Sequence, residues 1–129
     1  MDEARRLKRA QLVERIRTVE KGRAARASAE AERLSARLTG VAEKTRLLVS
    51  HYAATRHVET ADDLRRYAAM RRQLHSLGTL NASHLQDARH RADRALVELG
   101  NAERKRARIE SDRRALQKLA GARSFIDPS

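Results

Sequence analysis

Apolar residues recur at every seventh position along the second half of the chain. Seven of the eight positions in this series are apolar and only Asn81 is polar; the series is Tyr67, Leu74, Asn81, Ala88, Ala95, Ala102, Ile109 and Leu116. Further apolar residues lie three or four positions after members of the series: Met70, Leu77, Leu85, Ala92, Leu99 and Leu119. This alternation is typical of a coiled-coil seam. We call these residues the companions of the series. Charged residues stand where further companions are expected, at 105–106 and 112–113, so we expect the apolar seam to narrow toward the C-terminus.

The first half of the chain has a stripe of its own at helical spacing. It comprises Leu12, Ile16, Val19, Ala27, Ala31, Leu34, Leu38, Val41, Thr45, Leu48 and Tyr52. From Val19 through Arg23 to Ala27 and Ala31 the steps are all of four residues, which predicts a stutter that unwinds the supercoil locally. We therefore expect a long helix with an irregularity near Gly22.

A helix start signal separates the two stripes. Thr60 is followed three residues later by Asp63, which imitates a capping box at a helix N-terminus. The predicted elements are a helix over 4–56, a turn over 57–59, a helix over 60–121 and a short tail over 122–129. A second start signal, Ser83 with Gln86, lies inside the later stripe; the unshifted stripe favours a continuous helix, and a break over 78–83 is the alternative.

A short turn between two long helices makes them antiparallel. The sequence therefore predicts an all-α fold, a single long antiparallel two-helix coiled-coil hairpin over residues 1–129. Pairing the stripes outward from the turn places Leu48 beside Tyr67 and Met70. The second helix is expected to extend past the first, which would leave Leu116 and Leu119 without a partner inside the hairpin.

Positive charge is concentrated at both ends of the chain. The net charge is +12, from 29 basic and 17 acidic residues. Residues 1–26 hold nine basic and four acidic residues, and residues 101–123 hold eight and three, so each segment has a net charge of +5. An antiparallel hairpin would bring the two segments together as one basic tip.

No catalytic or metal-binding pattern is evident. The chain has no cysteine, and Gly40 to Thr45 lacks the second glycine and the preceding strand of a phosphate loop. The histidines never stand three or four residues apart, as two metal ligands on one helical face would; they are His51, His57, His75, His84 and His90. We therefore expect no enzymatic activity, cofactor or metal, and the polar N-terminus predicts neither a signal peptide nor a membrane span.

Nucleic acid is the partner that the charge first suggests, because a basic stripe is its electrostatic footprint. Aromatic residues, which stack on single-stranded bases, are only 2% of the chain. The basic segment after residue 100 also keeps the heptad Ala102, Ile109 and Leu116. Specific nucleic-acid recognition is therefore not expected, and non-specific phosphate binding is the alternative function.

Two segments resemble the FliJ family of flagellar export proteins and its YscO-type relatives in injectisomes. They are Leu64-Arg-Arg-Tyr67-Ala-Ala-Met70 with Leu74, and Ala95-Leu-Val-Glu-Leu-Gly-Asn-Ala102-Glu-Arg-Lys-Arg-Ala-Arg-Ile109 with Leu116 and Leu119. The resemblance implies a stalk-like component of a flagellar or type III protein export apparatus. Its implied partners are the export ATPase ring, the export gate protein and export chaperones, and its implied location is cytoplasmic, peripheral at the inner face of the cell membrane through these partners.

The resemblance also implies two binding sites. The paired termini would enter the ATPase ring, with contacts from Arg5, Arg6, Lys8, Arg9, Arg104, Lys105, Arg106, Arg108, Leu116 and Leu119. The region after the turn would contact the export gate through Met70, Leu74, Leu77 and Asn81. The alternative for these last four residues is that they simply fill the seam between the helices.

Overall fold

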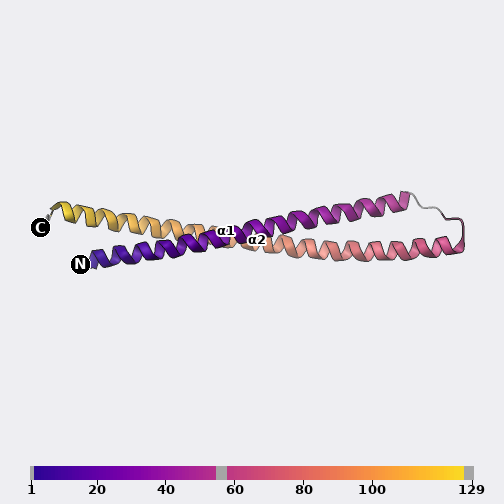
Figure 1. Ribbon diagram of the computed structural model, residues 1–129, viewed down its shortest axis with the longest axis horizontal. Coiled ribbons are helices and arrows are strands. Elements are labelled where there is room, and N and C mark those ends of the chain that lie inside the picture. Colours follow the sequence, from indigo (N-terminus) through magenta and orange to yellow (C-terminus); the bar gives the residue numbers. More distant parts are fainter. Residues whose placement is uncertain (1, 55–57, 127–129) are drawn as a thin grey trace. The chain divides into compact units, whose positions relative to one another are not determined.

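Two long helices make up the fold of the protein. The computed structural model describes residues 2–54 and 58–126, with side chains up to Arg123. Helix α1 spans Asp2–Ala54 and helix α2 spans Ala61–Ile126, and no strand occurs within the described ranges. The helices pack against each other as an all-α antiparallel hairpin (Figure 1), which confirms the predicted fold class.

The start of α2 is capped as the sequence predicts. The backbone N–H of Asp63 donates to the Thr60 hydroxyl at 3.1 Å, and the N–H of Leu64 donates to the Thr60 carbonyl at 3.2 Å. The Asp63 carboxylate accepts a hydrogen bond from the backbone N–H of Glu59 at 3.4 Å. These bonds satisfy N–H groups that a helix start leaves without intrahelical partners.

The helix ends differ slightly from the predicted ones. Helix α1 ends at Ala54, two residues before the predicted end, and residues 55–57, including part of the predicted turn, lie outside the described residues. Helix α2 passes through residues 78–83 without interruption, so the alternative break there is excluded. It also continues past the predicted end at 121 to Ile126, and Gly121 does not adopt the positive φ that commonly terminates a helix.

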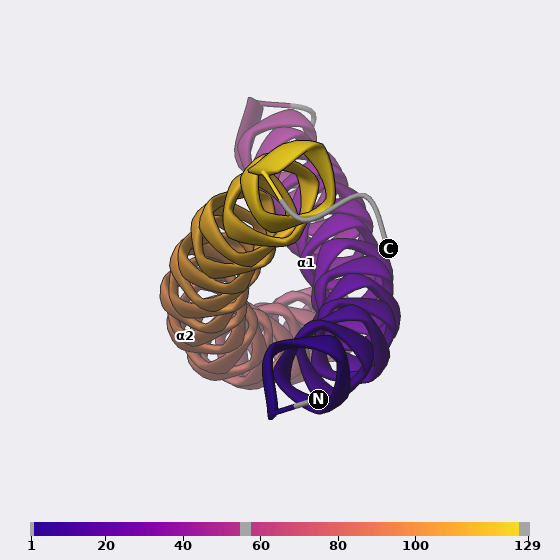
Figure 2. The same cartoon turned by 90° about the vertical axis from the view of Figure 1, so that its left-hand side faces the viewer.

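The chain divides into two compact units. Unit 1 comprises residues 1–29 and 94–129, and unit 2 comprises residues 30–93. In unit 1 the start of α1 and the end of α2 lie at the same end of the unit (Figure 2), and Glu3 pairs with Arg123 at 3.1 Å. Unit 2 contains the remaining parts of both helices and the connection between them.

The seam of α2 follows a strict heptad. All eight positions of the predicted series from Tyr67 to Leu116 are buried or half-buried, which confirms that series. The companions lie four residues after the series positions, and they are Gly78, Leu85, Ala92, Leu99, Arg106, Arg113 and Ala120. The expected narrowing is therefore wrong, since Arg106 and Arg113 take seam positions, whereas Met70, Leu77 and Leu119 are exposed.

The seam of α1 differs from the predicted stripe. It runs in regular steps of four and three residues without a stutter, through Glu3, Leu7, Ala10, Glu14, Arg17, Lys21, Ala24, Ser28, Ala31, Ser35, Leu38, Ala42 and Thr45. In unit 1 the predicted Leu12, Ile16 and Val19 are instead 57%, 56% and 52% exposed. The polar seam positions of α2 explain the difference, because Arg106 and Arg113 require hydrogen-bonding groups that aliphatic side chains lack.

A buried polar pair sets the register in unit 2. The Asn81 side-chain amide donates to the Thr45 hydroxyl at 2.9 Å, and this hydroxyl donates to the Val41 carbonyl at 2.9 Å. Nearer the turn, the Tyr52 and Tyr67 rings stack with centroids 5.6 Å apart. The pairing of Leu48 with Met70 is therefore wrong: Leu48 follows Thr45 by three residues and lies level with Gly78.

This register can be checked with spin labels at exposed positions. Lys44 paired with Leu80 lies close to the Thr45–Asn81 level, whereas Gln73 is displaced from Leu80 by about 10 Å along α2. We expect a shorter label distance for Lys44→Cys with Leu80→Cys than for Lys44→Cys with Gln73→Cys. The reverse order would support the pairing predicted from the sequence.

Candidate functional site

The basic residues expected to bind an ATPase ring all lie in unit 1. Seven of the eight side chains are exposed: Arg5, Arg6, Lys8, Arg9, Arg104, Lys105 and Arg108. Arg106 is half-buried in the seam. None of the seven forms an ion pair with another described residue, so unit 1 presents their charge to solvent.

The basic residues of the two helices lie at different levels of unit 1. Glu14 contacts Arg113 and Glu3 contacts Arg123, so residues 5–9 lie at the same level along the helices as the part of α2 between these arginines. The exposed Arg114 and Lys118 belong to that part of α2, and the sequence analysis did not include them in the site. Arg104, Lys105 and Arg108 lie further from the chain ends, so the predicted single basic tip is an extended basic surface.

The expected overhang of α2 is wrong. Arg123 reaches Glu3, so α1 accompanies α2 well past Leu116 and Leu119. Leu116 is half-buried and continues the seam, whereas Leu119 is 55% exposed. The seam uses Ala120 in place of Leu119, because Ala120 lies four residues after Leu116 and completes the heptad. Of these two leucines, Leu119 is the more accessible to a partner.

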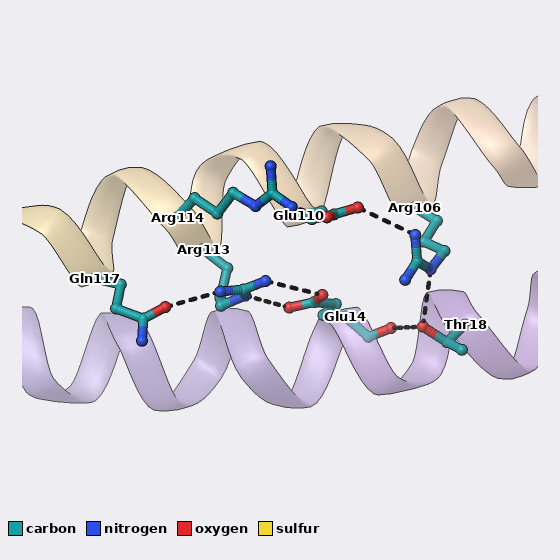
Figure 3. A network of polar contacts seen from close by, with 7 residues as sticks. All are labelled: Glu14, Thr18, Arg106, Glu110, Arg113, Arg114 and Gln117. Atoms are coloured by element: carbon teal, nitrogen blue, oxygen red, sulfur yellow. Dashed lines mark hydrogen bonds and ion pairs between the residues drawn. The ribbon is translucent and has the colours of Figure 1, made fainter.

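A bidentate ion pair joins the helices of unit 1 (Figure 3). Arg113 Nε donates to Glu14 Oε2 at 2.6 Å, and Arg113 Nη2 donates to Glu14 Oε1 at 3.5 Å. Its remaining Nη1 donates to Gln117 Oε1 at 2.8 Å. The Glu14 and Arg113 side chains are only 18% and 23% exposed, so water screens this pair less than a surface ion pair.

A second group of contacts lies one heptad away along α2. Arg106 Nε donates to the Thr18 hydroxyl at 3.2 Å, and its Nη1 donates to Glu110 at 3.1 Å. Glu110 also accepts from Arg114 Nη2 at 2.7 Å, while the Thr18 hydroxyl donates to the Glu14 carbonyl at 2.8 Å. Both arginines at seam positions of α2 are therefore paired, and no buried side-chain nitrogen or oxygen among the described residues lacks a partner.

The hydrogen bond from Arg113 holds the pKa of the Glu14 carboxyl below its ordinary value, against an opposing effect of desolvation. The charges of Arg113, Arg106 and Arg114 lower this pKa further. Because the pKa is lower in the folded state than in the unfolded state, the pair stabilises the fold above the unfolded pKa. That contribution is lost as the pH falls through the folded pKa.

This pH dependence predicts the behaviour of Glu14→Gln. At neutral pH we expect the variant to melt at a lower temperature than the parent protein, because glutamine cannot form the ion pair. The difference should shrink as the pH falls below the ordinary range for glutamate, as seen by circular dichroism melts. A matched control is Glu43→Gln, which removes an exposed pair with Arg46 inside α1 and should have a smaller effect at every pH. An equal effect of both variants would contradict the structural role of Glu14.

The four residues expected at the export gate separate into two pairs. Leu74 is buried and Asn81 hydrogen-bonds to Thr45, so these two belong to the seam. Met70 and Leu77 are 38% and 43% exposed and remain accessible. Leu48 was predicted to lie in the seam, but it is exposed. Leu48 and Leu77 both lie a few residues toward the turn from the Thr45–Asn81 pair, so they lie at similar levels along the two helices.

The described residues contain no group of three or more histidine, cysteine, aspartate or glutamate side chains arranged to hold a metal ion. Within the same residues, neither helix has an apolar stretch of the length needed to span a bilayer. Of the histidines considered as ligands, His57 lies outside the described residues.

No family model, curated protein or solved structure matches this chain. The functional assignment consequently depends on the surfaces themselves and on the resemblance of the two sequence segments.

The different environments of Leu116 and Leu119 predict different effects of serine. Leu116→Ser should lower the free energy of unfolding by about 1–3 kcal/mol, because it removes apolar burial from the seam. Leu119→Ser should change it by less than about 0.5 kcal/mol, as for most exposed positions. Urea denaturation followed by circular dichroism measures both values. Equal stability of the two variants would show that Leu116 does not pack against α1.

Proposed function

We propose that the protein is a non-enzymatic coiled-coil component of a flagellar or type III protein export apparatus. It binds the export ATPase ring through unit 1 and couples the ring to the export gate through unit 2. The observation that carries the proposal is the exposed, unpaired basic surface of unit 1, which includes Arg5, Arg6, Lys8 and Arg9. The resemblance to the FliJ family supplies the identity of the partners.

The basic surface fits a protein partner because its charge is separate from the charge that holds the hairpin together. Arg106 and Arg113 serve the seam through Thr18 and Glu14, and Arg123 pairs with Glu3. The exposed Arg5, Arg6, Lys8 and Arg9 are not used in this way and can face acidic groups on a ring. Leu119 adds an apolar contact that phosphate binding would not require.

For the gate contact, the accessible residues are Met70 and Leu77 rather than Leu74 and Asn81. Exposed Leu48 extends this apolar surface onto α1. In this proposal the protein is cytoplasmic and lies peripherally at the inner face of the membrane through its partners, which also include export chaperones.

Non-specific nucleic-acid binding is the second candidate, and the exposed arginines and lysines favour it. The two functions differ in what they require. Phosphate binding responds to the number of cationic groups and to salt. A ring contact depends on where those groups lie, because complementary charges must face each other across a defined interface.

A matched pair of charge reversals separates the candidates. The first variant changes Arg5, Arg6, Lys8 and Arg9 to Glu in unit 1. The control changes four exposed residues of unit 2 to Glu, namely Arg65, Arg66, Arg71 and Arg72. We expect the first variant to bind the export ATPase about tenfold more weakly and to lose stimulation of its turnover, while the control keeps both.

Binding of both variants to duplex DNA should fall to a similar extent, because they remove the same number of positive charges. Equal loss of ATPase binding in the two variants would contradict the placement of the site in unit 1. Parent protein that binds RNA but neither binds nor stimulates an export ATPase would favour the nucleic-acid function.

A further inference from the structure

The outer face of α1 in unit 1 carries an apolar stripe that the hairpin does not use. Leu12, Ile16 and Val19 are separated by four and three residues, so they lie on one face of the helix. Each follows a seam residue by two positions, which corresponds to a rotation of about 200° around the helix. The stripe therefore points away from α2, and each of its side chains is more than half exposed.

The stripe carries larger aliphatic groups than the seam behind it. The corresponding seam positions are Ala10, Glu14 and Arg17, of which only Ala10 is apolar. Single exposed leucines are ordinary, but three large aliphatic residues in helical register form a contact surface of the kind that packs against another helix. Leu12, Ile16 and Val19 contribute little to the association of α1 with α2, because they lie outside the seam.

The charges around the stripe select the type of partner. Exposed cationic residues lie before, within and after it, at Lys8, Arg9, Arg15, Arg23 and Arg26. The nearest acidic residue on this side, Glu20, accepts a hydrogen bond from Arg17 at 2.9 Å. A partner must therefore bring acidic groups on both sides of an apolar strip.

These charges also argue against two other occupants. A second copy of the same stripe would place like charges opposite each other, which destabilises an interface. An anionic membrane would attract the cations, but a stripe of three aliphatic residues without an aromatic residue buries little apolar area in a bilayer surface. An acidic amphipathic helix satisfies both the charges and the stripe.

We propose that Leu12, Ile16 and Val19, with the surrounding arginines and lysines, form a docking site for an acidic amphipathic helix of another protein. This site lies on the outer face of α1 and shares only Lys8 and Arg9 with the surface proposed for the ATPase ring. It would give unit 1 a second protein partner while α1 and α2 stay paired.

The test uses a fluorescein-labelled synthetic helical peptide with a leucine stripe flanked by glutamates. The comparison peptide keeps the leucines and replaces every glutamate with lysine. We expect the parent protein to bind the glutamate peptide at least about tenfold more tightly than the lysine peptide, as measured by fluorescence anisotropy. Equal binding of the two peptides, or binding of neither peptide, would overturn the proposal.

A triple variant tests the stripe itself. Leu12→Gln, Ile16→Gln and Val19→Gln together should weaken glutamate-peptide binding by at least about tenfold and leave the melting temperature nearly unchanged. The matched control is Leu96→Gln with Val97→Gln, which replaces residues of unit 1 that are 56% and 62% exposed on α2. This control should bind like the parent protein, and equal loss in both variants would refute the assignment.

Three further measurements have decisive outcomes. If the triple variant unfolds, the stripe has a structural role and the proposal is wrong. A lower melting temperature of Ile16→Gln alone would confirm that structural role. If the parent protein dimerises in sedimentation and the triple variant is monomeric, a second copy occupies the stripe. If the triple substitution abolishes binding to phosphatidylglycerol vesicles and the glutamate peptide does not bind, the stripe is a membrane contact.

Discussion

The ion pair between Glu14 and Arg113 determines which side of α1 faces α2 in unit 1. Two oxygens of one carboxylate meet two nitrogens of one guanidinium, and this geometry fixes the rotation of the helix as well as its distance from the partner. A rotation that buried Ile16 would carry Glu14 to the outside and leave Arg113 in the seam without an acceptor. Leaving a partly buried charge unpaired costs more than burying the aliphatic groups would gain.

The same requirement shapes the rest of the molecule. In unit 2 the hydrogen bond between Asn81 and Thr45 has the corresponding role, because a single polar layer specifies how two helices align. Large side chains contribute little to this choice, since none of those that the structure describes is fully buried. The hairpin thus combines a modest apolar seam with polar contacts that define its geometry, and its remaining charges and aliphatic groups are left on the surface.

The fold and the capping of α2 could be predicted from the sequence because they depend on local signals. A seven-residue period identifies the seam of α2, and Thr60 with Asp63 marks its first turn. The seam of α1 could not be found in the same way, because the apolar period at the start of α1 belongs to Leu12, Ile16 and Val19, which are exposed. The informative signal was the spacing of Arg106 and Arg113, which lie one heptad apart among the companions of the α2 series and indicate that α1 must present polar groups. The roles of the surface residues depend on partners, so their function stays a proposal.

Small side chains dominate the seam positions midway along both helices. On α1 these positions are Ala24, Ser28, Ala31 and Ser35, and on α2 they are Ala88, Ala92 and Ala95. A shift of one heptad would replace Ala24 by Ala31, Ser28 by Ser35 and Ala88 by Ala95, so steric fit at these positions distinguishes poorly between neighbouring registers. The information that fixes the register is therefore concentrated in a few polar pairs, which include Glu14 with Arg113 and Asn81 with Thr45.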